Sequence, residues 1–122
     1  MDTEEAKAIT RRGEGQHTEF KKSLSADNEA IKSLCAFANA DGGTVFFGIT
    51  NNGEYLGISL GNNTLENFAN KLRRGTSPPL SPSIEEIRFN GLIIVAATVQ
   101  KAERGRLYHA FNTPFIRVGK TN

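Results

Sequence analysis

Residues 34–49 read LCAFANADGGTVFFGI, and this stretch decides the fold. Within it and just before it, four apolar side chains recur at the spacing of one helix face: Ile31, Leu34, Cys35 and Ala38. We expect a helix that is capped by Asp27 or Asn28 and runs to about Ala40. The aspartate and two glycines at positions 41–43 end it, because glycine is common just after a helix C-terminus.

The end of the same stretch has the period of a strand. Residues 44–50 predict a β-strand, and three of their side chains share one face: Val45, Phe47 and Ile49. Residues 51–53 are Asn-Asn-Gly, which accepts the positive φ angles of a tight turn. The apolar run over residues 55–58 predicts that this turn closes a β-hairpin.

The segment before this unit is charged and then alternates. We expect an arm or a short helix over residues 1–12. After a glycine turn, residues 17–22 alternate between polar and apolar side chains, which predicts a half-buried strand. Glu19 and Lys21 lie on one face of that strand and Phe20 on the other.

A second helix is predicted to begin at Thr64 and to end before Gly75, the residue type that commonly stops a helix. Its apolar stripe consists of Leu65, Phe68 and Leu72. Its last turn carries three cations, which suit the helix dipole: Lys71, Arg73 and Arg74. Residues 77–83 are rich in serine and proline, and we expect an extended connection there.

Another hairpin follows this connection. Residues 84–89 and 92–99 are predicted strands separated by Asn90-Gly91, a sequence typical of a two-residue turn. The second run is apolar on both faces, which predicts a central strand with cover on each side of the sheet.

The chain ends with a polar loop over residues 101–112 and a predicted short strand over residues 115–118. In that strand we expect Ile116 and Val118 to face inward and Arg117 to face outward. The whole order predicts an α+β fold that has a mixed or antiparallel sheet of about five to six strands and two main helices.

Length and composition indicate one ordinary globular domain over residues 13–122. The chain has 122 residues, of which 38% are hydrophobic and 23% charged, which excludes a collagen or a coiled coil. No apolar run approaches the roughly 20 residues that span a bilayer, and the N-terminus does not resemble a secretory signal, so we expect no membrane partner. Cys35 is the single cysteine, which excludes an intrachain disulfide and favours a cytoplasmic location.

The charges are distributed unevenly. The formal net charge is +2, but residues 1–61 carry −3 and residues 62–122 carry +5. A basic half attracts polyanions such as nucleic acid, although the same excess is compatible with simple solubility.

Two enzyme-like patterns fail on inspection. Residues 118–121 read VGKT, like the end of a phosphate-binding P-loop, but Pro114 stands where that loop requires glycine. Cys35 lies on the apolar helix stripe, which favours a buried hydrophobe over a catalytic thiol. Neither pattern predicts an activity.

Glu14, Glu19 and Lys21 form the candidate catalytic group. If the two carboxylates converge, they can bind Mg²⁺ or Mn²⁺, which activates water against a phosphodiester, while Lys21 offsets phosphate charge. The simpler alternative is a surface pair of Glu19 with Lys21 beside a solvated turn.

The basic residues of the second half form the candidate nucleic-acid interface. If the second helix and the last loop meet, the following can bind phosphates: Lys71, Arg73, Arg74, Arg104, Arg106, Arg117 and Lys120. Tyr108 and Phe111 lie in the same basic loop and can stack on unpaired bases. The alternative is a soluble rim whose aromatic rings face the core.

Four segments, read together, carry a family resemblance: Gly13-Glu14 with Glu19-Phe20-Lys21, then residues 34–49, then the turn 51–53 with Gly57, then residues 115–119. In this order and spacing they resemble the Schlafen AlbA-like domain family, over roughly residues 10–122. The resemblance implies an α+β fold in which Asn39 and the glycines shape the turn from helix to strand.

The resemblance also implies a function. It suggests a nucleic-acid-binding module, with DNA favoured over RNA, that forms the N-terminal domain of a prokaryotic transcriptional regulator and is followed by further domains. Paired lobes in some relatives imply a homodimer.

Alternatives stay open. Some Schlafens are ribonucleases that depend on Mg²⁺ or Mn²⁺, and two of their three acids match Glu14 and Glu19. Asn51 and Asn52 stand near the place of the third acid, which weakens the case for cleavage because an amide is no general base. A dimerisation or protein-interaction domain without any cofactor is the third reading.

Overall fold

The computed structural model describes the backbone of residues 1–122 and all side chains except those of Ala26 and Asp27. The expected cap at Asp27 therefore lies outside the described side chains. The elements are α1 (Thr3–Arg11), β1 (Thr18–Lys21), the short 3-10 helix η1 (Leu24–Ala26), α2 (Asp27–Asn39), β2 (Gly43–Phe47), α3 (Thr64–Gly75), β3 (Thr76–Ser77), β4 (Ser83–Phe89), β5 (Leu92–Val99), β6 (His109–Ala110) and β7 (Thr113–Pro114).

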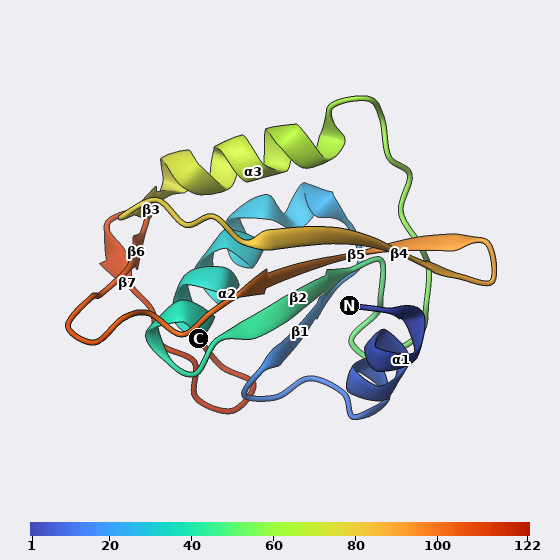
Figure 1. The fold of residues 1–122 in the computed structure, drawn as a ribbon, viewed down its shortest axis with the longest axis horizontal. Coiled ribbons are helices and arrows are strands. Elements are labelled where there is room, and N and C mark those ends of the chain that lie inside the picture. Colours follow the sequence, from blue (N-terminus) through green and yellow to red (C-terminus); the bar gives the residue numbers. More distant parts are fainter.

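The main sheet has four strands in the order β1-β2-β5-β4. β1 is parallel to β2, whereas β5 is antiparallel to both of its neighbours, β2 and β4. A small second sheet has the antiparallel order β3-β6-β7. The predicted α+β class with a mixed sheet is confirmed, and the N-terminal segment forms a helix of its own (Figure 1).

Each face of the main sheet packs on helices (Figure 1). On one face, α2 and α3 cover β2 and β5, and the buried residues there include Leu34, Phe37, Val45, Phe68 and Val95. On the other face, α1 contributes Ala6 to a cluster that includes Phe20, Phe46, Phe89 and Ile94. The apolar character of β5 on both faces follows from its place inside this sandwich, as the sequence predicts.

The junction between α2 and β2 explains the two glycines that follow the helix. Gly42 has φ +81° and donates its N–H to the carbonyl of Phe37 at 2.7 Å, which ends the helix. A Cβ added at Gly43 would lie 2.7 Å from the Phe37 ring and 2.9 Å from the His17 carbonyl. Both positions therefore need glycine, the first for its backbone angle and the second for space.

The second strand expected over residues 55–58 does not form. The Asn-Asn-Gly turn is present, but only Ile49 and Tyr55 make an antiparallel bridge. The chain then bends at Gly57, which has φ +75°, while the Tyr55 ring stacks on Phe89 at 4.8 Å. The apolar residues of this run thus pack on the sheet without joining it.

The strand expected over residues 115–118 is also wrong, and its faces are reversed. Arg117 is 2% exposed, whereas Ile116 is 56% and Val118 71% exposed. No neighbouring strand pairs with this segment in the described chain. What orients it is the guanidinium of Arg117, which is considered below.

None of the helices in the described part of the chain combines the length and apolar character needed to cross a bilayer.

Candidate nucleic-acid interface

The last turn of α3 presents cations to solvent. Leu72 is fully buried and Phe68 nearly so, which leaves Arg73 and Arg74 on the exposed side of the helix. The guanidinium of Arg73 donates to the side-chain carbonyl of Asn70 one turn earlier. The amphipathic pattern of α3 therefore fixes the direction of both arginines.

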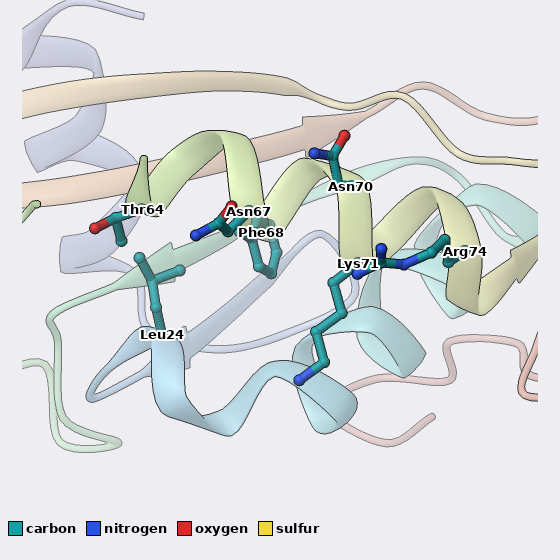
Figure 2. Close-up of a pocket in the computed structure, with 7 residues that line it drawn as sticks. All are labelled: Leu24, Thr64, Asn67, Phe68, Asn70, Lys71 and Arg74. Carbon is teal, nitrogen blue, oxygen red and sulfur yellow. The ribbon is translucent and has the colours of Figure 1, made fainter. Parts of the chain in front are cut away.

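A groove of about 540 Å³ lies between α3 and the segment that contains Leu24, and it is called the α3 groove below. It is lined by Leu24, Thr64, Asn67, Phe68, Asn70, Lys71 and Arg74. Figure 2 shows Lys71 and Arg74 on the same stretch of α3, while Leu24 points toward the helix from the segment before α2. Amides and cations thus line a groove that has an apolar base.

The small sheet joins the end of α3 to the last loop. In β3, Thr76 pairs with Ala110 and Ser77 with His109, and both partners lie in β6. β3 begins directly after α3, so this pairing brings loop 101–108 to the end of the molecule where α3 ends (Figure 1). The meeting of helix and loop that the sequence analysis required is therefore present.

Loop 101–108 carries the other exposed arginines. Arg104 and Arg106 are both solvent-exposed in the turn that follows β5. A hydrogen bond with Tyr108 raises the pKa of the Arg106 guanidinium, and the charge of Glu103 acts in the same direction. We use the name basic end for the four residues Arg73, Arg74, Arg104 and Arg106.

Lys120 belongs to a different part of the surface. It is exposed in a turn closed by mutual backbone hydrogen bonds between Val118 and Thr121, at 2.7 and 3.0 Å. The N–H of Gly119 donates to the side chain of Gln16 at 2.8 Å, which anchors this turn beside the start of β1. Lys120 is thus held by contacts separate from those that build the basic end.

Arg117 is a buried structural cation. Its Nη1 donates to Glu19 Oε2 at 3.1 Å, and its guanidinium lies 4.8 Å from the centre of the Phe37 ring. Its other acceptors are the carbonyls of Gly15, Thr18 and Gly119 and the side-chain oxygen of Asn122. A guanidinium enclosed in this way has no surface to offer a phosphate, so Arg117 is left out of the interface proposed below.

The carboxyls of Glu14 and Glu19 do come together. Burial raises the pKa of the Glu19 carboxyl, a hydrogen bond with Glu14 raises it further, and Arg117 acts in the opposite direction. Glu14 Oε2 also accepts the backbone N–H of Phe20 at 3.0 Å. The expected surface pair of Glu19 with Lys21 is replaced by the buried pair of Glu19 with Arg117.

This donor set does not fit a divalent cation. Glu19 already has Arg117 as its counter-charge at 3.1 Å, and Glu14 already accepts the backbone N–H of Phe20. Among the described side chains, no three of His, Cys, Asp or Glu gather as metal ligands. Asn51 and Asn52 are exposed in their turn. We therefore derive no metal-dependent step from these residues.

Two details of the site were not predicted from the sequence: the contacts that Asn39 makes with the last loop, and the backbone conformation of Phe111. Asn39 bonds the backbone of Tyr108 in both directions and the carbonyl of Phe115, each at 2.8 Å, and so ties the last loop to α2. Phe111 is 43% exposed at the tip between β6 and β7 and has φ +51°. Its aromatic character is visible in the sequence, but its backbone angle is not.

Comparison with known proteins supports the fold. The family model described as Schlafen, AlbA_2 matches residues 14–122. The N-terminal domain of a putative ATP-dependent DNA helicase RecG-related protein from Nitrosomonas europaea is similar, with a TM-score of 0.64, 19% identity, and coverage of 89% of this chain and 82% of that one. A comparison with curated proteins gave no match.

A longer protein contains a similar fold. The DIP2311 protein from Corynebacterium diphtheriae superposes with a TM-score of 0.70 at 18% identity, over 87% of this chain. The matched part is 21% of that protein, so the present chain spans about a fifth of its length.

Proposed function

Because the chain belongs to the Schlafen AlbA_2 family, we propose that it is a nucleic-acid-binding module that holds the phosphate backbone at its basic end. DNA is the favoured partner, in keeping with the DNA helicase for which one structural relative is named. We place the module at the N-terminus of a transcriptional regulator, where other domains read base sequence.

The observation that carries this proposal is the pairing of β3 with β6. Without it, Arg73 and Arg74 on α3 and Arg104 and Arg106 in the loop have no reason to lie near one another. The pairing attaches the segment that follows loop 101–108 to the end of α3, and this attachment supports our proposal that the four cations act together. All four cations are exposed, and none of them forms an ion pair among the described residues, although the charge of Glu103 acts on Arg106.

The chemistry of such a surface is electrostatic. Binding of cations to phosphates releases condensed counterions, so affinity depends on salt and little on sequence. Guanidinium groups suit this role because they donate two parallel hydrogen bonds to a phosphate and remain charged at any relevant pH.

The test compares two double variants that change net charge equally. Arg73→Gln with Arg74→Gln removes two cations from the basic end, and Arg11→Gln with Arg12→Gln removes two exposed cations from the end of α1. Fluorescence anisotropy with single- and double-stranded DNA and RNA measures the affinities. We expect the first variant to weaken binding of unrelated sequences similarly, and the second to leave binding unchanged. Equal affinities of both variants for every probe would reject the proposal.

The same samples decide between this proposal and the alternatives. Cleavage of structured RNA in Mn²⁺ that is lost in Glu14→Gln would favour the nuclease. Glu14 is chosen because it does not contact Arg117 in the described hydrogen bonds. Sedimentation of the free protein tests the homodimer that we propose as its oligomeric state.

A further inference from the structure

The tip between β6 and β7 combines an exposed aromatic ring with an unusual backbone. Phe111 and Asn112 have φ of +51° and +65°, a left-handed conformation that bulky side chains rarely adopt. Phe111 donates its N–H to the carbonyl of Gly75 at 2.9 Å, which fixes the tip against the end of α3. Phe111 is nevertheless 43% exposed, so a large part of its apolar surface faces solvent.

The ring of Phe111 forms one wall of a small recess, called the Phe111 recess below. A Cβ added at Gly75 would lie 3.2 Å from Phe111 Cε1, so the ring already covers Gly75 on one side. The recess measures about 240 Å³ and is lined by Arg74, Gly75, Thr76, Ser77, His109, Phe111 and Asn112. It contains an aromatic ring, a guanidinium, an imidazole and an amide, and no acid.

We propose that the Phe111 recess holds one unstacked nucleobase of a single-stranded segment, with Phe111 as the stacking surface. This inference rests on the proposed nucleic-acid function and names the form of nucleic acid. Every base has a π face, so an aromatic platform binds bases without selecting among them. His109 and Asn112 offer hydrogen-bonding groups to the edge of the base.

Arg74 connects the Phe111 recess to the α3 groove. It lines both the Phe111 recess and the α3 groove, so one guanidinium stands between the base site and the cations of α3. A strand whose base enters the recess can therefore place its neighbouring phosphate at Arg74. Duplex DNA keeps its bases stacked inside and gains only the phosphate contacts.

The chemistry of the lining favours a base over a protein partner. The core of a protein interface needs a cluster of apolar side chains, whereas Phe111 is the only large apolar residue of the recess within the described chain. The cation at its edge and the nearby basic end favour a polyanion. A second copy of this chain is the competing occupant, and the test includes it.

The first experiment removes the π face while keeping an apolar side chain. Phe111→Leu is compared with the original protein on three probes: a short oligothymidine, an abasic oligomer of the same length, and a DNA hairpin duplex. We expect Phe111→Leu to weaken oligothymidine binding about 5- to 150-fold, the range for loss of one stacked base. Binding of the abasic oligomer and of the duplex should stay within about twofold, because phosphate contacts supply them.

The second experiment reports the contact directly. The chain has no tryptophan, so Phe111→Trp introduces a single fluorophore that also keeps a stacking surface. Oligothymidine should quench it, and the abasic oligomer should not. Leu56→Trp is the control, because Leu56 is 47% exposed and lies outside the recess lining. Its fluorescence should respond equally little to both probes.

The outcomes separate this inference from the proposed function. If Phe111→Leu weakens all three probes equally, or none, while Arg73→Gln with Arg74→Gln still reduces binding, the base site is wrong and the phosphate interface stands. If no probe binds the original protein, both fail. A dimer in sedimentation that Phe111→Leu dissociates would assign the ring to a second copy and overturn the base site.

Discussion

Arg117 shows how one side chain can reverse which residues of a segment face the core and which face solvent. Its guanidinium satisfies five acceptors, which come from the turn before β1, from Glu19 and from the C-terminal residues. Strand alternation predicts that Arg117 faces water, because an arginine is rarely buried unless it is paired. Its partner Glu19 lies 98 residues earlier in the chain, and a local sequence pattern cannot predict a contact between such distant residues.

We predict that Arg117→Met strongly destabilises the fold. The variant removes every hydrogen bond that the buried guanidinium donates, including the one to the carbonyl of Thr18, and removes the counter-charge of Glu19. The expected loss in the free energy of unfolding is about 3 to 5 kcal/mol, as for one partner removed from a buried ion pair. Urea denaturation measures it, with Arg88→Met on the exposed side of β4 as control. A loss equal to that of the control contradicts the structural role.

Glu19 gives the stability a predictable pH dependence. Its pKa is raised above the ordinary 4.5, chiefly by burial and then by Glu14, against the effect of Arg117. A carboxyl with a raised pKa binds its proton more tightly in the folded state. Its contribution to stability is therefore present in full below pH 4.5 and is lost as the pH rises through the raised value.

The corresponding variant is Glu19→Gln. Between pH 4.5 and neutrality, we expect the free energy of unfolding of the original protein to fall relative to that of Glu19→Gln. Urea denaturation across this interval measures the difference, and an NMR titration of Glu19 measures its pKa directly. A Glu19 pKa below 4.5, or parallel pH profiles of the two proteins, would contradict the assignment.

Among the elements, the regular ones were predictable and the irregular ones were not. α2, α3, and the β4–β5 hairpin follow from apolar spacing and from glycine or asparagine at their ends, and the structure confirms them. The runs at 55–58 and 115–118 have strand-like composition, but neither of them pairs with a strand of the main sheet. Whether an apolar run joins a sheet depends on its neighbours in space, which periodicity does not contain.

Part of the candidate site was likewise predictable from the sequence and part was not. The cations of α3 follow from its amphipathic pattern, and the composition of loop 101–108 indicates the others. The contact between helix and loop depends on the two-residue pairing of β3 with β6, which is too short to give a sequence signal. Asn39 fixes the far end of that loop, and an asparagine at a helix end is ordinarily explained as a cap.

At this scale we predict that Asn39→Ala loosens the last loop from α2. Three hydrogen bonds at 2.8 Å to the backbone of Tyr108 and Phe115 are lost. At about 0.5 to 1.5 kcal/mol each, the expected cost is about 2 to 4 kcal/mol in the free energy of unfolding. Faster hydrogen exchange at the Tyr108 amide should accompany it. Asn67→Ala on exposed α3 is the control, and unchanged exchange at Tyr108 would show that Asn39 does not hold the loop.

In the molecule as a whole, the packing of helices on both faces of the main sheet leaves most charged side chains at the surface. Apolar side chains fill both faces of the main sheet, so the cations of the second half lie at the periphery. The small sheet ties the last loop to the end of α3, where we propose that four of these cations act together. Arg117 is instead buried inside the fold, and Lys120 lies in a separate turn. Charge counted along the chain therefore overstates the cations that are available to a partner.

The central claim is that this end of the molecule binds phosphates, and the salt dependence of affinity tests it most directly. For four phosphate contacts, log K should fall with log salt at a slope of about −3 to −4. Arg73→Gln with Arg74→Gln should make the slope shallower by about 2, and Arg11→Gln with Arg12→Gln should not change it. A slope near zero, or the same slope in both double variants, would contradict the account.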